Sequence, residues 1–312
     1  MNYIVTGGAG FLGSNLTRRL IKEGHHVHVV DNYITGSRNN LNDLQHDSGF
    51  VAIENCDIKD FDFKNDSARF DRILNLACPA SPVAYQNAPF QTISASTEGL
   101  LNMLKAAKHY GARILHTSTS EVYGDPGVHP QPESYWGNVN CYGPRACYDE
   151  GKRMGEGIIW EYKRKYNLET RIVRIFNTYG PHMAKDDGRV VSNFICQALK
   201  NEPITIYGDG KQTRSFCYVD DLLDIMLMVL EGVYEAPLNI GNPGEFTMIE
   251  LAKTVIEVTD SKSEIVFKQL PFDDPKQRRP DISRVKNLYN WEPKIQLKEG
   301  LEKTATYFAT II

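Results

Sequence analysis

The chain opens with a strand, a glycine-rich turn and a helix, and this order restricts the folds open to it. Residues 2–6 are a short apolar run of strand length, and Gly7, Gly10 and Gly13 follow with the spacing G-x-x-G-x-x-G. Apolar residues then recur at helical spacing over residues 14–23. Glycines so placed allow a tight turn, let the backbone approach a pyrophosphate and let the helix pack on the strand. The sequence therefore predicts a dinucleotide-binding unit here.

An acidic residue ends the second predicted strand. Residues 27–30 form an apolar run that stops at Asp31, eighteen positions after Gly13. A carboxylate at about this distance accepts hydrogen bonds from an adenosine ribose and repels a 2′-phosphate. We therefore expect NAD rather than NADP, although Arg38 is near enough in sequence to leave some doubt.

Strands and helices alternate through the first half of the chain. Further strands are predicted over residues 50–54, 72–76, 113–117 and 171–176, and a long helix over residues 89–109. Alternation of this kind predicts an α/β fold with a Rossmann-type, doubly wound parallel sheet. Ligands of such sheets bind outside the carboxyl ends of the strands. We therefore expect one crevice at the residues that end or follow strands: Gly7, Asp31, Asp57, Cys78, Thr119 and Asn177.

Beyond residue 177, proline and glycine residues divide the chain into short elements. We predict a NAD-binding Rossmann domain over residues 1–176, with a return to its sheet near residues 215–240. Residues 177–312 are then mainly a smaller, interleaved α/β domain that binds the substrate.

Size and charge exclude several classes of protein. The chain has 312 residues, of which 41% are hydrophobic, and a formal charge of −4, so we expect neither a nucleic acid nor a membrane as partner. The first predicted strand begins at residue 2, which leaves no room for a signal peptide and predicts a cytoplasmic protein. The six cysteines have no C-x-x-C spacing, and the eight histidines lack ligand spacing, so we expect reduced thiols and no metal.

Tyr148 and Lys152 lie four residues apart, which places both side chains on one face of a helix. An ammonium group beside a phenol favours the phenolate, so the tyrosine could act as a base nearer neutral pH. This spacing is common by itself. With Thr119 upstream and the glycine turn, it predicts a nicotinamide enzyme that uses a tyrosinate.

These features resemble the extended short-chain dehydrogenase/reductase family over nearly the whole chain, and its UDP-glucuronate decarboxylase branch in particular. The segments that carry the resemblance are residues 118–126, 143–153, 174–181, 187–194, 210–216 and 278–282. Two departures stand out: Cys141-Tyr142 replaces the usual Pro-Ile, and Ser96 replaces a frequent asparagine. The first could alter the loop over the sugar, and neither touches the catalytic set.

The resemblance implies a redox-neutral reaction. Tyr148, with its pKa lowered by Lys152 and the nicotinamide charge, would take the proton of the sugar C4 hydroxyl while hydride passes to NAD+. Thr119 would orient that hydroxyl. The resulting 4-keto acid loses CO2 readily, because the electron pair is delocalised as an enolate. Protonation at C5 and return of the hydride would give UDP-xylose.

Glu121 is the residue that separates the alternatives. Epimerases of this family usually have a small or apolar residue there, and 4,6-dehydratases have Asp-Glu where this chain has Ser120-Glu121. In relatives, the matching glutamate and Arg278 are assigned to the sugar carboxylate and the C5 proton. An epimerase, a dehydratase and an oxidative decarboxylase that releases NADH and a UDP-4-keto-pentose remain alternatives. A non-catalytic NAD sensor would be expected to have lost part of this set.

The expected site has three groups of residues. The catalytic group is Thr119, Glu121, Tyr148, Lys152 and Arg278. The NAD contacts are Gly7, Gly10, Phe11, Leu12, Gly13, Asp31, Asn32, Asp57, Ile58, Leu76, Ala77, Tyr148 and Lys152. The UDP-sugar contacts are Pro79, Ala80, Glu121, Asn177, Arg189, Asn193, Ile206, Tyr207, Gln212, Arg214 and Arg278. Relatives commonly pair through two long helices, so we expect a homodimer with a four-helix interface formed by residues 90–109 and 149–166.

Overall fold

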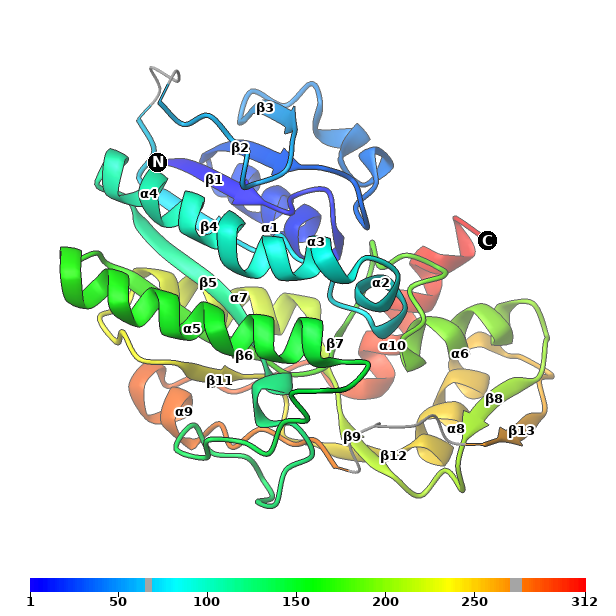
Figure 1. Ribbon diagram of the computed structural model, residues 1–312. Coiled ribbons are helices and arrows are strands. Elements are labelled where there is room, and N and C mark those ends of the chain that lie inside the picture. Colours follow the sequence, from blue (N-terminus) through cyan, green and yellow to red (C-terminus); the bar gives the residue numbers. More distant parts are fainter. Residues whose placement is uncertain (65–68, 270–276) are drawn as a thin grey trace.

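A seven-stranded parallel sheet forms the centre of the computed structural model, which describes residues 1–64, 69–269 and 277–312 (Figure 1). Its strands stand in the order β11-β6-β5-β4-β1-β2-β3, and every neighbouring pair is parallel. The strands are β1 (Asn2–Thr6), β2 (His26–Asp31), β3 (Phe50–Asn55), β4 (Arg72–Asn75), β5 (Arg113–Thr119), β6 (Thr170–Ile175) and β11 (Leu238–Ile240). The strand order reverses between β1 and β4, which confirms the predicted doubly wound α/β fold.

Alternation along the strands gives this sheet two hydrophobic faces. Val5 packs in one core with α1 (Phe11–Lys22) and α7 (Val219–Glu231), whereas its neighbour Ile4 packs in another. The second core contains residues of α4 (Leu100–Tyr110) and α5 (Ala146–Tyr166), which lie side by side across that face (Figure 1). Successive side chains of a strand point to opposite faces, so continuous apolar strands require a cover on both sides.

The predicted helix over residues 89–109 is not uniform. It consists of α3 (Pro89–Ser94), one π-helical turn (Ala95–Gly99) and α4. In the π turn Ser96 is buried, and its hydroxyl lies 3.5 Å from the Cys78 sulfur. Gly99 also admits the Ile58 side chain, which would lie 2.5 Å from an added Cβ. The π turn depends on these tertiary contacts, so the spacing of apolar residues in the sequence does not predict it.

The second half of the chain forms three two-stranded sheets with a helical cluster. The strands pair as β8 (Ile204–Tyr207) with β13 (Ile265–Lys268), β9 (Thr213–Ser215) with β12 (Glu245–Thr247), and β7 (Thr178–Tyr179) with β10 (Cys217–Tyr218). Three helices pack together beside them: α6 (Val190–Leu199), α8 (Met248–Thr259) and α10 (Leu297–Ala309). The short α9 (Ser283–Tyr289) packs on β11. Helix α7 and β11 return to the large sheet, whereas the predicted division into two domains stays a prediction.

Candidate active site

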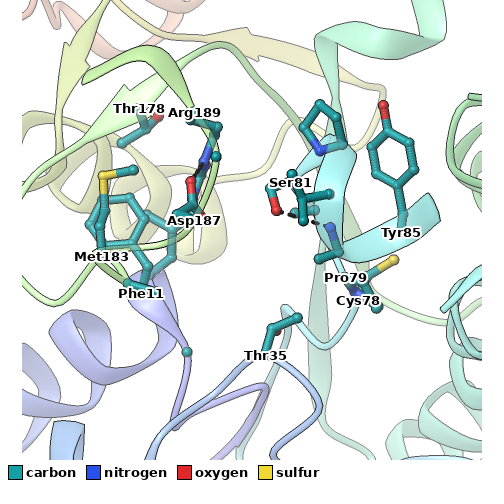
Figure 2. A pocket seen from close by; sticks show the side chains of 18 of the residues that line it. Phe11, Thr35, Cys78, Pro79, Ser81, Tyr85, Thr178, Met183, Asp187 and Arg189 are labelled. Carbon is teal, nitrogen blue, oxygen red and sulfur yellow. Dashed lines mark hydrogen bonds and ion pairs between the residues drawn. The ribbon is translucent and has the colours of Figure 1, made fainter. Parts of the chain in front are cut away.

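One cavity of about 990 Å³ lies at the carboxyl ends of the large-sheet strands and extends to β8 and β9. Figure 2 shows two of its walls: Cys78, Pro79 and Tyr85 follow β4 on one side, and Asp187 and Arg189 lie opposite. Every residue that the sequence assigns to the catalytic, NAD and UDP-sugar groups lines this cavity. The structure therefore brings the whole predicted set together, although the individual contacts with ligands stay predictions.

The glycine turn between β1 and α1 leaves room for a phosphate group. Gly7 has φ +67°, and a Cβ there would lie 2.9 Å from the Ala77 Cα. A Cβ on Gly13 would lie 2.1 Å from the Gly7 carbonyl oxygen. These positions require glycine because the turn, the helix and the strand approach closely, and the amino end of α1 faces the cavity where a pyrophosphate would bind.

Asp31 is buried at the end of β2, and the chain holds its carboxylate by backbone hydrogen bonds. Its oxygens accept from the backbone N–H groups of Ala9, at 2.9 Å, and of Tyr33, at 2.8 Å. Burial raises the pKa of this carboxyl, and the two hydrogen bonds oppose the rise. Arg38 lies outside the cavity, with its guanidinium carbon 5.0 Å from the centre of the Tyr33 ring. The Asp31 carboxylate, held in this way, is suited to accept hydrogen bonds from a ribose diol and would repel a 2′-phosphate.

The predicted base and its neighbours converge from β5 and α5. Thr119 ends β5, while Tyr148 and Lys152 lie on the first turns of α5, and all three side chains are buried. The Lys152 ammonium donates to the Thr117 carbonyl at 2.8 Å and lies 5.8 Å from the centre of the Tyr148 ring. The helix spacing predicted from the sequence is therefore confirmed.

The pKa of Tyr148 differs from the lowered value that the sequence predicts. Burial raises it well above its usual value, and a hydrogen bond with Thr119 opposes the rise only in part. A buried phenolate requires cations close by, and the nearest, Lys152, is turned toward a backbone carbonyl. A bound nicotinamide ring would supply the further positive charge on which the prediction depends.

Glu121 lies in the short 3₁₀ turn η3 (Ser120–Tyr123) that follows β5, and two arginines bind its carboxylate. Arg278 Nη1 lies 3.1 Å from Oε1, and Arg145 Nη2 donates to Oε2 at 2.7 Å. Burial alone would raise the pKa of Glu121, but the two guanidinium groups outweigh it and lower that pKa to about 2. Glu121 is therefore ionised at neutral pH in this arrangement, and its side chain is only 18% exposed, unlike that of a surface acid.

The opposite end of the cavity carries further cations and amides. Arg189 pairs with Asp187 and lies over the Phe11 ring at the start of α1, with 5.8 Å from its guanidinium carbon to the ring centre. Its charge thus stands beside the glycine turn, where a diphosphate would lie. The remaining predicted sugar and nucleotide contacts line the same region: Asn177, Asn193, Ile206, Tyr207, Gln212 and Arg214. Ile204, at the start of β8, is fully buried and does not line the cavity.

Sequence reasoning missed two cavity residues next to the catalytic set. Tyr85 belongs to α2 (Pro82–Asn87), and its ring stacks on Tyr148. Arg145 precedes α5 and binds Glu121. The segment around Arg145 contributed to the family resemblance, but no pattern of spacing links either residue to the catalytic set.

Across residues 1–64, 69–269 and 277–312, no three His, Cys, Asp or Glu side chains are grouped as metal ligands would be. No helix within these ranges is long and apolar enough to cross a membrane.

Comparison with known proteins supports the resemblance. The family model "NAD dependent epimerase/dehydratase family" matches residues 3–241. UDP-glucuronic acid decarboxylase 3 of Arabidopsis thaliana is 53% identical over 302 residues, which are 96% of this chain and 87% of that protein. UDP-glucuronic acid decarboxylase 1 of Xenopus tropicalis is 48% identical over 98% of this chain and 71% of that protein.

Solved structures agree with the fold over the full chain. UDP-glucuronic acid 4-epimerase from Bacillus cereus, in complex with UDP-glucuronic acid and NAD, has a TM-score of 0.90 at 27% identity and covers 100% of both chains. UDP-glucose 4-epimerase from Thermotoga maritima, with UDP-glucose, has a TM-score of 0.91 at 30% identity, over 100% of this chain and 99% of that one.

Proposed function

This chain belongs to the NAD-dependent epimerase/dehydratase family, and we therefore propose that it decarboxylates UDP-glucuronate to UDP-xylose through a 4-keto intermediate. The observation that carries the proposal is the ion pair between Glu121 and Arg278 in the same cavity as Thr119 and Tyr148. An epimerase of a neutral sugar has no carboxylate to bind and no epimerase protonates C5, whereas a decarboxylase must handle both a carboxylate and a proton at C5.

NAD held at the glycine turn would supply reversible hydride transfer at C4. Tyr148 accepts the proton of the C4 hydroxyl, and Thr119 orients that hydroxyl by hydrogen bonding. Lys152 supplies positive charge below the phenol. The ketone then lies β to the carboxylate, so the C5–CO2 bond breaks with its electron pair delocalised onto the C4 oxygen. The protein needs to position and stabilise this enolate.

Glu121 and Arg278 lie at the carboxylate end of the sugar in this proposal. Arg278 is buried, and besides Glu121 it donates to the Ser120 hydroxyl at 2.9 Å and the Gly124 carbonyl at 3.0 Å. A planar guanidinium held in this way is suited to orient a carboxylate. A proton for C5 must come after CO2 leaves, and Glu121 can give one only when its pairing with the arginines loosens.

Sequence identity to the relatives ranks the alternative activities. The decarboxylases named above are 48% and 53% identical to this chain, and the epimerases of known structure 27% and 30%. The Bacillus cereus epimerase acts on the same uronate, so 4-epimerisation is the alternative that an experiment must exclude. Ser120 in place of the dehydratase aspartate weighs against a 4,6-dehydratase.

We also propose a homodimer through α3, α4 and α5. Several large apolar side chains of α3 and α5 are exposed there, among them Phe90, Ile93, Met154 and Trp160. Exposed apolar residues that cluster on neighbouring helices are typical of an interface, and two helices from each copy would form a four-helix contact.

A cytoplasmic location is supported by six cysteines without disulfides, which suit a reducing compartment.

The deciding experiment follows UDP-glucuronate by NMR while absorbance at the NADH band is recorded. UDP-xylose without accumulation of NADH is the expected result. Stoichiometric NADH with a UDP-4-keto-pentose would move the protein to the oxidative branch. UDP-galacturonate would indicate an epimerase, and unchanged UDP-glucuronate would refute the substrate.

A further inference from the structure

Arg145 joins the helix of the predicted base to Glu121. It is the residue before α5, its side chain is mostly buried, and it lines the cavity. Its Nη2 donates to Glu121 Oε2 at 2.7 Å, and its Nε lies 3.8 Å from Asp149 Oδ2. The Arg145 side chain therefore spans from the first turn of α5 to the turn that follows β5.

The two arginines on Glu121 are held differently. Arg278 is anchored from three sides, because the Ser120 hydroxyl and the Gly124 carbonyl accept from it as well as Glu121. Arg145 is anchored through its own backbone: its carbonyl accepts from the N–H groups of Tyr148 and Asp149, each at 3.0 Å. A shift of the Arg145 side chain would therefore be passed to the turn that carries Tyr148.

We infer that Arg145 is a positioning residue of the proposed decarboxylation: its guanidinium ties the first turn of α5 to Glu121 and so fixes Tyr148 relative to the carboxylate end of the sugar. This inference rests on the proposed function. Two bonds of the substrate react in turn, at C4 and at C5, and the groups that act on them come from separate elements. A link between those elements is what a two-site reaction on one sugar ring requires.

The charges around Glu121 give the inference a signature in pH dependence. Arg278 and Arg145 face the Glu121 carboxylate directly. Tyr85 and Tyr148 lie within electrostatic range of Glu121. Asp149 lies within electrostatic range of Arg145. Burial acts to raise the Glu121 pKa, and the arginines lower it to about 2. Removing one guanidinium weakens the opposing effect, so the pKa must rise. The acidic limb of the kcat profile should then move to higher pH.

The test compares Arg145→Met and Arg145→Lys with the control Arg164→Met. Arg164 lies on the same helix, but its side chain is 66% exposed and pairs with Glu161. For each variant, NAD affinity, kcat and KM for UDP-glucuronate would be measured from pH 3.5 to pH 9. NADH absorbance in a single turnover would report the C4 step separately from the formation of UDP-xylose.

We expect Arg145→Met to lower kcat about 10- to 100-fold with a small change in KM. Its NAD affinity should stay within about twofold of wild type, since the Rossmann turn is untouched. Wild type should show no loss of kcat from Glu121 within this range, whereas Arg145→Met should show an acidic limb, because its Glu121 pKa rises by about one to three pH units. Arg145→Lys should recover part of kcat and remove most of the limb, because it restores the charge without the fork of donors. Arg164→Met should match wild type.

Three outcomes would overturn the inference. Arg145→Met could match Arg164→Met in kcat and pH profile. Arg145→Met and Arg145→Lys could lose the same activity with the acidic limb unmoved, which would leave Arg145 a purely structural role. The wild-type protein could leave UDP-glucuronate unchanged, which would refute the proposed function and this inference together, whereas the first two results leave the proposed function intact.

Discussion

Tyr85 and Tyr148 stack face to face in the wall of the cavity, with ring centroids 5.0 Å apart and ring planes 7° from parallel. Tyr85 is 1% exposed, and its hydroxyl has no hydrogen-bond partner among the described residues. The ring of Tyr85 therefore supports the predicted base by packing, because its polar group makes no such bond.

Tyr85→Leu and Tyr85→Phe should separate the ring from the hydroxyl. The leucine variant loses the stacked surface and leaves space, so we expect it to lower the free energy of unfolding by about 2–4 kcal/mol. The phenylalanine variant removes a buried hydroxyl that makes no hydrogen bond and should be neutral or slightly stabilising. Urea titrations of the NAD-loaded protein measure both. Equal losses in the two variants would show that the hydroxyl has a partner.

Tyr148→Phe should abolish turnover and leave NAD binding largely intact. The phenol is the group that takes the C4 proton in our proposal, and general-base catalysis contributes about 10²- to 10⁴-fold to a rate. The ring remains in place, so the packing against Tyr85 is kept. UDP-xylose formation by NMR and NAD affinity by calorimetry are the two measurements. Near-normal activity would refute the tyrosinate.

Much of the large sheet was predictable, and the reason lies in its apolar strands. Short segments with adjacent isoleucine and leucine, such as residues 72–76 and 113–117, predict buried parallel strands because they alternate with helices, and their carboxyl ends locate the crevice. The small sheets were not predictable, because β8 pairs with β13 across more than fifty residues and each strand has only four. No local periodicity records such a pairing.

The residues of the site also divide into those that sequence motifs predict and those that only the structure reveals. Sequence motifs predict that residues such as Thr119 and Tyr148 lie near the strand ends, and both line the cavity. Arg145 and Tyr85 were missed because their importance depends on side chains that meet from distant segments. The lowered pKa of Tyr148, which depends on Lys152 and the nicotinamide charge together, stays a prediction. Spacing reveals the lysine but not the depth of burial, which raises this pKa in the chain by itself.

Asp31→Asn should weaken NAD binding and reduce discrimination against NADP. The substitution keeps the shape but removes the charge that holds the ribose diol and repels a 2′-phosphate. We expect the dissociation constant for NAD to rise about tenfold, which corresponds to about 1.4 kcal/mol, and that for NADP to fall or stay unchanged. Calorimetry with both dinucleotides measures this. Asp60→Asn, an exposed change outside the cavity, serves as the control. A parallel loss for both dinucleotides would contradict the assignment.

Trp160→Glu and Phe90→Glu should dissociate the proposed dimer. The two side chains are 63% and 80% exposed on α5 and α3, and burying a carboxylate in an apolar interface is costly. Light scattering after gel filtration should report a dimer for wild type and a monomer for these variants. Val233→Glu alters a side chain that is 91% exposed beyond α7 and should leave the dimer intact. A monomeric wild-type protein would refute the interface.

Glu121 should also stabilise the fold in a way that depends on pH. Its pKa is about 2 in the folded protein and near 4.5 when unfolded, so between these values the unfolded chain binds the proton more readily. The contribution is therefore fully present above about pH 5 and is lost as the pH falls toward 2. Glu121→Gln has no such group, so its free energy of unfolding should approach that of wild type as the pH is lowered. Urea titrations of both proteins from pH 6 to pH 3.5 measure the difference, in which other titrating groups largely cancel. A difference that stays constant over this range would mean that the two arginines do not hold the carboxylate ionised.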